Sequence, residues 1–305
     1  MCIRDSAYCL GFPAEKSVLS VLEQYRNNLY VEYAEPNGII YAYDIIPNDP
    51  YFGSQWGLKK IAVSEAWGIE KGENDIVVAI LDTGIDYDHE DLAGHIWINQ
   101  GEYGLPKSTN SIDDDGNGKK DDWQGWDFIG TGYFDNNGNA IDPVPDNDPM
   151  DDHGHGTHVA GIVGALTDNG IGVAGVCWNV KLMMVRVLDA SGAGNAGYLA
   201  SGIDYAKEMG AHIINMSLGG VENSTLKLAV SSALNNGCLL VAATGNSNSN
   251  VIPFPAAYDS YVLAVGAVDE NDNRAIWPGS GGSNYGPEID VAAPGSSIYL
   301  SLIHI

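Results

Sequence analysis

Basic residues are scarce in this sequence of 305 residues, which has 14 lysines and arginines against 40 aspartates and glutamates. The formal net charge is −26. Nucleic-acid phosphates are bound mainly through lysine and arginine, so this deficit argues against a nucleic-acid partner. An excess of carboxylates instead suits a soluble protein that binds cations.

Cysteines and long apolar runs are also few. The chain has four cysteines, and Cys9, Cys177 and Cys238 show no spacing typical of a disulfide framework. Cys238 lies in the apolar run "GCLLVAA", which predicts a packed, buried thiol. No apolar run is long enough to span a bilayer, so the sequence predicts no membrane-spanning segment.

The two ends of the chain look foreign to the protein. Codons for the opening "MCIRDS" have a reverse complement that encodes the closing "LSLIHI". One DNA element read in both directions explains this, and it resembles the transposase end used in sequencing adapters. Such scars are set aside in fold reasoning. We expect residues 1–6 and 300–305 to be artefact, and residues 7–299 to be a fragment open at both ends.

Continuous apolar runs alternate with helical patterns from residue 70 onward. The strands expected are "DIVVAILDTG", "KLMMVRVLD", "HIINMSLGG", "CLLVAATGN" and "YVLAVGAV", and the helices are "HGTHVAGIVGAL", "AGYLASGIDYAKEMG" and "TLKLAVSSALNNG". Strands buried on both faces between helices predict an α/β fold with a doubly wound parallel sheet. Residues 101–152, rich in Asp, Asn and Gly, indicate a long surface insertion.

Three polar residues follow strands or begin a helix, at the sheet edge where ligands of such folds bind. Asp82 ends the first strand, although a strand-end Asp is more often a cap. His155 stands between glycines at a helix start, where a carboxylate can fix its tautomer for proton transfer. Asn246 follows a later strand, as a turn residue or as a donor to an oxyanion. A zinc cluster of His153, His155 and His158 is not favoured, because no His-Glu-x-x-His pattern supports it.

Together these motifs resemble the subtilisin family of serine peptidases, in order from about residue 49 to residue 299. "VVAILDTGID", "HGTHVAGIVGA", "INMSLGG", "VAATGN" and "APGSSIY" match its blocks. The resemblance implies a serine endopeptidase in which Asp82 orients His155, His155 is the general base and Asn246 stabilises the oxyanion. It implies that the strand Ser217-Leu218-Gly219 pairs with peptide substrates. Gly192 and Gly194, within residues 192–195, would lie on the opposite side of that cleft.

The family's nucleophile block, Gly-Thr-Ser-Met-Ala, does not occur in the sequence. None of the later serines has that context; these are Ser280, Ser283, Ser296, Ser297 and Ser301. We expect a peptidase domain over residues 46–299 that is truncated before its nucleophile, so that the chain itself is inactive. The alternative is a non-catalytic, calcium-stabilised peptide-binding protein on the same scaffold.

The N-terminal segment resembles the end of an inhibitory propeptide. A helical pattern up to Tyr25 is followed by a β-rich run, Leu29–Tyr33, and "LYVEYAEPN" is similar to the last strand of the family's α+β propeptide. The resemblance implies that residues 7–45 are propeptide and linker, that processing falls between Asn37 and Asn48, and that the protein is secreted. The alternative is an ordinary N-terminal extension.

The sequence predicts calcium sites. "DDDGNGKKDD" places Asp113, Asp115 and Asn117 as alternating oxygen ligands on a glycine-bent loop, with Asp121 as a further ligand. Gln124 stands where an EF-hand has Glu, so a true EF-hand is not expected, and a solvated acidic loop is the alternative. The family resemblance implies a second site formed by the side chains of Asp49, Asp91 and Asn169 and the carbonyls of Leu166, Ile171 and Val173.

Overall fold

The structure is a computed structural model that describes residues 11–13, 16–36, 44–130, 133–134, 140–141, 144–279 and 281–300. The expectations for residues 1–6, Cys9, Ser280 and residues 301–305 lie outside these ranges, as does cleavage within residues 37–43. The chain divides into two compact units, Met1–Tyr43 and Asp44–Ile305. Each is described separately below.

The first unit contains one described helix, α1, which spans Val18–Arg26. Its N-terminus is capped by the Ser17 hydroxyl, which accepts a hydrogen bond from the main-chain N–H of Ser20. The strand expected at Leu29–Tyr33 does not form, because these residues make turns and bends instead. The side chains of Leu29 and Tyr30 are 98% and 97% exposed. A strand needs a partner, and the described part of this unit offers none.

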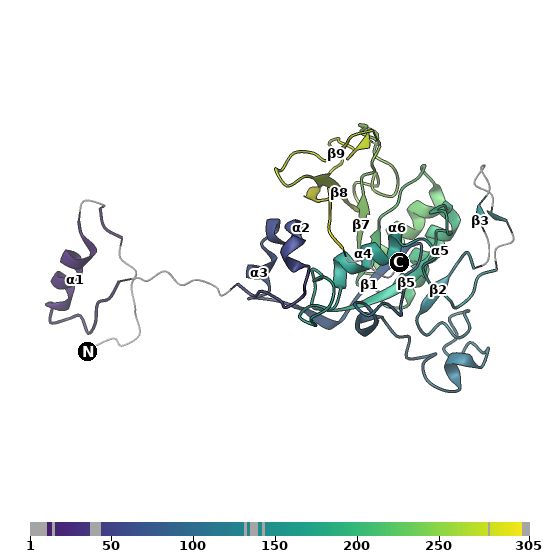
Figure 1. Cartoon of the computed structure of the whole chain (residues 1–305), viewed down its shortest axis with the longest axis horizontal. Helices are drawn as coiled ribbons and strands as arrows, with labels where there is room; N and C mark the ends of the chain where they lie inside the picture. The colour runs from purple at the N-terminus through teal and green to yellow at the C-terminus, as the bar shows by residue number, and fades with distance from the viewer. Residues whose placement is uncertain are drawn as a thin grey trace. The chain divides into compact units, whose positions relative to one another are not determined.

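The second unit is built on a parallel sheet of seven strands in the order β11-β8-β7-β6-β1-β5-β2 (Figure 1). The strands are β1 (Gly72–Asp82), β2 (Gly125–Asp127), β5 (Asn179–Arg186), β6 (Ile213–Met216), β7 (Leu239–Ala243), β8 (Leu263–Val268) and β11 (Val291–Pro294). The main helices are α4 (His155–Gly164), α5 (Ala196–Glu208) and α6 (Ser224–Asn235). The strands and helices expected from residue 70 onward are confirmed.

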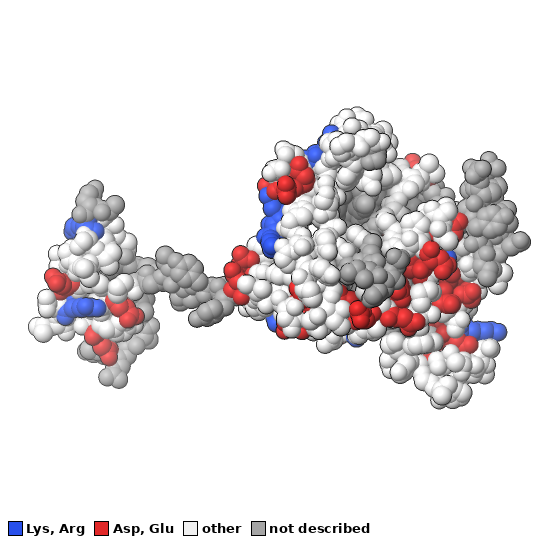
Figure 2. Space-filling model, viewed as in Figure 1, with Lys and Arg blue, Asp and Glu red and all other residues white. Residues whose placement is uncertain are grey.

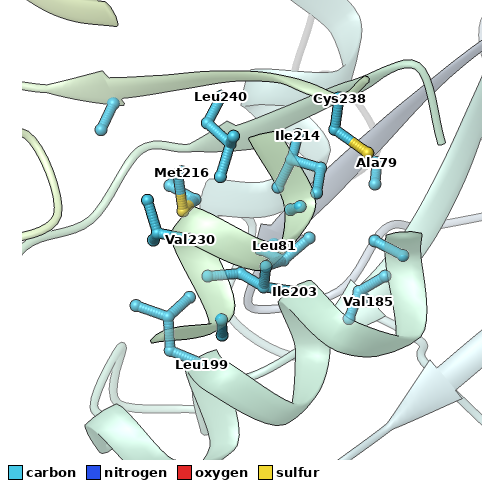
Figure 3. Packing of buried hydrophobic residues seen from close by; sticks show 14 of the residues in the cluster. Ala79, Leu81, Val185, Leu199, Ile203, Ile214, Met216, Val230, Cys238 and Leu240 are labelled. Atoms are coloured by element: carbon cyan, nitrogen blue, oxygen red, sulfur yellow. The ribbon is translucent and has the colours of Figure 1, made fainter. Parts of the chain in front are cut away.

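Helices cover both faces of the sheet, because side chains of a strand alternate between its faces. Leu81 of β1 faces α5 and α6 and joins the core cluster that contains Ile203 and Val230 (Figure 3). Its neighbour Ile80 belongs to the cluster on the other face, with Ala160 of α4. Burial on both faces explains why β1 is a continuous apolar run, and it confirms the doubly wound α/β fold.

Cys238 is a buried free thiol at the start of β7, as expected. Its Sγ atom lies 3.2 Å from the carbonyl oxygen of Ala211. Cys238 belongs to the core cluster that contains Leu81, Ile203 and Val230 (Figure 3). Burial raises its pKa. This thiol therefore has a packing role.

The interpretation of residues 101–152 as a surface insertion was incomplete. β2 lies within it and pairs with β5, so the insertion supplies an edge strand of the main sheet. The strand has three residues, too short for a periodic pattern to reveal. The insertion also holds the 3₁₀ turn η3 (Lys107–Thr109) and the hairpin β3 (Tyr133–Phe134) and β4 (Ala140–Ile141).

Short elements complete the second unit. They are η1 (Phe52–Ser54), α2 (Trp56–Lys60), α3 (Val63–Ala66), η2 (Ala93–His95), β9 (Ile276–Trp277) and β10 (Gly281–Gly282). Acidic side chains gather around β2 and the loop before it (Figure 2). Within the described ranges, no helix has the length and apolarity needed to cross a membrane.

Candidate active site

The carboxyl end of β1 brings Asp82 against the first residue of α4, His155. The Oδ1 atom of Asp82 lies 2.7 Å from Nδ1 of His155 and also accepts a hydrogen bond from the main-chain N–H of Thr83. An ionised carboxylate can only accept, so Nδ1 carries the proton and Nε2 of the neutral ring is left with a lone pair. The Asp82 side chain is fully buried, whereas 45% of the His155 side chain is exposed.

The hydrogen bond to Asp82 favours protonated His155 and raises its pKa, against the opposing effect of burial. Solvent access to a ring that is oriented by a buried carboxylate is the arrangement required of a general base. Oδ2 of Asp82 is buried and has no hydrogen-bond partner among the described residues.

Glycines permit the close contact between strand and helix. Gly154 precedes α4 with a φ angle of 96°, in the left-handed region that side chains disfavour. A Cβ atom on Gly156 would lie 2.0 Å from the carbonyl oxygen of Gly84 and 3.1 Å from Cβ of Asp82. Any side chain at position 156 would therefore push His155 away from Asp82.

A buried ion pair lies beside this junction. Arg186 ends β5 in register with Asp82. Its Nε lies 3.5 Å from Oδ2 of Asp127, and its Nη1 lies 3.0 Å from Oδ2 of Asp152 and donates to the carbonyl of Met150. Burial raises the pKa of Asp127 to about 6, although the charge of Arg186 opposes this. Through its contacts with Met150 and Asp152, Arg186 ties the segment before α4 to the sheet.

Asn246 lines a hollow of about 580 Å³ on the second unit. The walls are formed by residues 217–222, residues 243 and 245–247, residues 251–254 and Asn284. Pro253 and Phe254 are among them. The side-chain amide of Asn246 makes no hydrogen bond within the described part of the chain. It is therefore available as a donor.

The predicted substrate strand, Ser217-Leu218-Gly219, follows β6 and lines the same hollow. Gly192 and Gly194 lie elsewhere, on the loop after β5, and do not line it. A Cβ atom on Gly192 would lie 3.4 Å from Nε2 of His153. Among the described residues, Glu222 is the one charged residue that lines the hollow, and it was not predicted from the sequence. Its position next to the "SLGG" strand was the available signal.

A buried glutamate completes the acidic loop. Ligand oxygens of Glu102, Asp113 and Asp115 lie within 4.8 Å of one another. Glu102 has no exposed surface; its Oε1 accepts main-chain hydrogen bonds from Asp114 and Asp115, and its Oε2 has no partner among the described residues. Burial raises its pKa. A buried carboxylate with one unpaired oxygen, close to two further carboxylates, fits the oxygen set that calcium prefers.

The other residues predicted for this loop lie differently. Asp121 is not in the group: its carboxylate accepts hydrogen bonds from the main-chain N–H groups of Asn110 and Ser111. Asn117 donates its amide to Asp115 and Asp122. The sequence motif could not identify Glu102, which precedes the loop and reaches it only in the fold.

The residues of the second predicted calcium site also lie together. Asn169 donates its side-chain amide to Oδ1 of Asp91 and its main-chain N–H to Oδ1 of Asp49. The carbonyl of Asp91 accepts the N–H of Leu166, its Oδ2 accepts that of Val173, and the Asn169 amide oxygen accepts that of Ile171. Burial raises the pKa of Asp49 and of Asp91. Two buried carboxylates at one place suit a divalent cation.

Histidines do not form a metal site in the described ranges. The one group of three metal-binding side chains found there contains only the acidic residues Glu102, Asp113 and Asp115. His155 is bonded to Asp82, and burial lowers the pKa of His158. The zinc interpretation therefore has no support from the geometry.

The sequence is similar to known serine proteinases over most of its length. A sequence model of the subtilase family matches residues 73–303. The chain is 38% identical over 284 residues to the thermophilic serine proteinase of Bacillus sp. (strain AK1), covering 92% of this chain and 59% of that protein. It is 41% identical over 255 residues to thermitase of Thermoactinomyces vulgaris, covering 83% and 75%. The chain thus spans about three fifths of the length of the Bacillus relative.

A solved structure is similar as well. A protease from Pseudoalteromonas arctica PAMC 21717 superimposes with a TM-score of 0.62 at 33% sequence identity, covering 82% of this chain and 72% of that one. The family match covers most of the chain, and it includes both the strand that ends in Asp82 and the helix that begins with His155. The chain belongs to the subtilase family.

Proposed function

We propose that this chain forms the acid–base pair and substrate cleft of a serine endopeptidase whose nucleophile is not among its 305 residues. The observation that carries the proposal is the 2.7 Å contact between buried Asp82 and accessible His155. The hollow lined by Asn246 supports it, because a free amide donor beside an apolar pocket suits peptide binding next to an oxyanion site.

In the proposed reaction Nε2 of His155 takes the proton of a serine hydroxyl as that oxygen bonds to the peptide carbonyl carbon. Asp82 holds the ring and stabilises the imidazolium that forms. The carbonyl oxygen becomes an oxyanion and accepts a hydrogen bond from Asn246. His155 then gives its proton to the leaving amine, and water releases the acyl group by the same steps.

The test is hydrolysis by the chain extended through its own downstream coding sequence. An independent read past Tyr299 should reach a Gly-Thr-Ser block in frame, and the extended protein should cleave peptides with products identifiable by mass. Replacement of that serine by alanine should abolish cleavage. A natural stop after Ile305 would overturn the proposal and favour the non-catalytic peptide-binding alternative, since these 305 residues lack the nucleophile block.

Asn246→Ala in the extended enzyme should lower turnover by about 10²–10³ with little change in KM, because the donor acts on the developing oxyanion. Ser247→Ala, at the neighbouring position of the same hollow, is the matched control and should keep most of the turnover. If Asn246→Ala had the turnover of the control, the assignment of Asn246 would be wrong.

Calcium is a further part of the proposal. Glu102, Asp113 and Asp115 would hold one ion, and Asp49, Asp91 and Asn169 would take part in a second. The support is the unpaired Oε2 of Glu102. A bound cation would supply charge compensation for carboxylates that the fold buries.

We also propose that residues 7–45 are the end of an inhibitory propeptide and that the protein is secreted. The separate compact unit Met1–Tyr43 supports an independent segment at this end. In the extended enzyme, replacement of the nucleophile by alanine should prevent release of the segment before Asp49. Release that continued without the nucleophile would argue against self-processing, and a full-length coding sequence without an export signal would argue against secretion.

The proposed substrate side chain for the hollow is apolar, or basic with an apolar stem. Leu218, Ile252 and Phe254 line it, and Glu222 gives it one negative charge. Glu222→Gln should lower the preference for Lys over Leu at this subsite by up to about fivefold, because an exposed ion pair contributes roughly 0.2–1 kcal/mol. Unchanged kcat/KM ratios for matched Lys and Leu peptides would remove Glu222 from substrate selection.

A further inference from the structure

A second carboxylate, Asp151, lies at the junction of β1 and α4. It is half-buried and precedes His155 by four residues, in the non-helical segment before α4. Its Oδ1 accepts hydrogen bonds from the Thr83 hydroxyl at 2.8 Å and from the main-chain N–H groups of His153 and Gly154, both at 2.9 Å. Its Oδ2 accepts the main-chain N–H and the hydroxyl of Thr157, at 2.9 and 2.6 Å. Each oxygen of Asp151 therefore accepts at least two hydrogen bonds from this chain.

These contacts connect the neighbours of the two catalytic candidates. Thr83 directly follows Asp82, and its hydroxyl also accepts the main-chain N–H of Gly156, the residue after His155, at 2.9 Å. Thr157 connects the helix back to the strand, because its hydroxyl accepts a hydrogen bond from the main-chain N–H of Asp86, just beyond the end of β1. Thr83 and Thr157 are 1% and 3% exposed. The strand end and the helix start are thus joined through one carboxylate and two buried hydroxyls.

We infer that Asp151 is a positioning residue that fixes the Asp82–His155 pair by connecting Thr83 to the first turn of α4. The catalytic effect of Asp151 rests on the proposed function. Its effect on the contact between Asp82 and His155 does not depend on that function. Gly154 and Gly156 have no side chains that could set the direction of the chain at this point. The Asp151 contacts hold the main chain on both sides of His155.

The charge of Asp151 has a second effect on the same ring. The groups around His155 are Asp82 in direct contact, Asp151, His158 in the same helix, and His153, whose ring centroid lies 6.3 Å away. The hydrogen bond to Asp82 raises the pKa of His155 most, burial opposes it, and the charges of Asp82 and then of Asp151 raise it further. Asp151 stays ionised: burial opposes its charge, but the bonds from Thr157, Gly154 and His153 lower its pKa.

The test compares Asp151→Asn with Asp152→Asn, which removes the same charge one residue away, where the carboxylate pairs with Arg186. Titration of the His155 ring by nitrogen-15 NMR in the 305-residue chain needs no nucleophile. Asp151→Asn should lower the pKa of His155, and Asp152→Asn should leave it near the wild-type value. Equal shifts in the two variants, or no shift in either, would overturn the inference.

The second measurement uses the extended enzyme. Asp151→Asn should lower kcat by about tenfold to a hundredfold at a pH where His155 is neutral, with KM within about twofold, because small misplacements of catalytic groups are costly. Unchanged kcat would overturn the inference. If the wild-type extended enzyme does not hydrolyse peptides, the proposed function fails while the titration still decides the role of Asp151.

A pair of variants at Thr83 covers the case in which Asp151→Asn does not fold. Thr83→Val keeps the shape but removes the hydroxyl that joins Asp151 to the N–H of Gly156. It should lower the pKa of His155 by loosening its contact with Asp82. Thr83→Ser keeps the hydroxyl and should restore the wild-type titration. Identical titrations for valine and serine would show that the connection does not position His155.

Discussion

The junction of β1 with α4 and the acidic loop before β2 both concentrate carboxylates, but they satisfy them differently. At the junction, both oxygens of Asp151 accept hydrogen bonds from this chain, and its pKa is lowered. In the loop, Oε2 of Glu102 has no partner among the described residues, and burial raises the Glu102 pKa. The hydrogen bonds of Asp151 are complete within the chain, whereas Oε2 of Glu102, like Oδ2 of Asp82, is left without a partner among the described residues. In the proposed function a cation would compensate the charge of Glu102.

This difference separates two roles for acidic residues in one protein. Carboxylates with enough N–H and O–H donors hold a precise geometry without a cation. Carboxylates packed against each other repel, and their ionisation opposes folding until a cation binds. The net charge of −26 alone does not distinguish the two roles.

The largest expected loss of stability comes from leaving a carboxylate beside the junction buried without a compensating charge, as Glu102 is in the loop. Arg186→Met leaves Asp127 buried, 1% exposed, without its compensating charge. Removing one partner of a buried pair costs about 3–5 kcal/mol, so we expect a loss of this size in the free energy of unfolding. Urea denaturation of the extended protein measures it.

The control is the double variant Asp127→Asn with Arg186→Met, which removes the stranded charge as well. It should recover part of the lost stability. A single variant Arg186→Met as stable as the wild type would show that the ion pair does not hold the segment before α4.

The second prediction makes the loop resemble the junction by adding calcium. A ligand that binds only the folded state stabilises it by about 2.7 kcal/mol at a hundredfold excess over its Kd. We expect a higher Tm in calcium than in chelator, with part of the increase lost in Glu102→Gln. Asp269→Asn removes one charge from another loop and should keep the full increase. Equal melting in calcium and chelator would exclude stabilising sites.

The third prediction concerns the sign of the pH dependence in chelator. The pKa of Glu102 is raised, so its ionisation costs stability progressively as pH rises above about 4.5. The pKa of Asp151 is lowered, so its contribution is present above about 3.8 and lost as pH falls. Between pH 4 and pH 7, Glu102→Gln should therefore become more stable relative to wild type, whereas the deficit of Asp151→Asn should stay nearly constant there and shrink only as pH falls below about 3.8. Denaturation over both pH ranges measures this. A Glu102→Gln variant that lost stability relative to wild type as pH rose to 7, or an Asp151→Asn deficit that grew below about pH 3.8, would argue against these two roles.

The sequence predicted much of the fold because its buried strands are unbroken apolar runs. β1 and β5 lie at the centre of that pattern, and their residues face core on both sides. β2 was not predicted, because three residues carry no period. The strand expected at Leu29–Tyr33 failed for the opposite reason: its residue types favour a strand, but pairing is a property of the fold and its side chains are left exposed.

The site shows the same division. Asp82, His155 and Asn246 could be predicted as site residues because each stands at a strand end or helix start within a motif. Glu102 was missed because only the tertiary structure brings it to the acidic loop, whereas Glu222 was missed although it lies next to the "SLGG" strand in the sequence. Asp121 fits the spacing of a ligand and stays a prediction; its carboxylate accepts hydrogen bonds from nearby main-chain N–H groups and lies outside the group of Glu102, Asp113 and Asp115.

If Asp82 and His155 activate a serine, covalent labelling of that serine by a fluorophosphonate should depend on both residues. The extended enzyme should be labelled at one serine of the Gly-Thr-Ser block. Labelling should be lost in His155→Ala and fall by about 10⁴ in Asp82→Asn, because the orienting carboxylate is removed. The 305-residue chain should not be labelled. Labelling at the wild-type rate in His155→Ala, or in the 305-residue chain, would contradict the account.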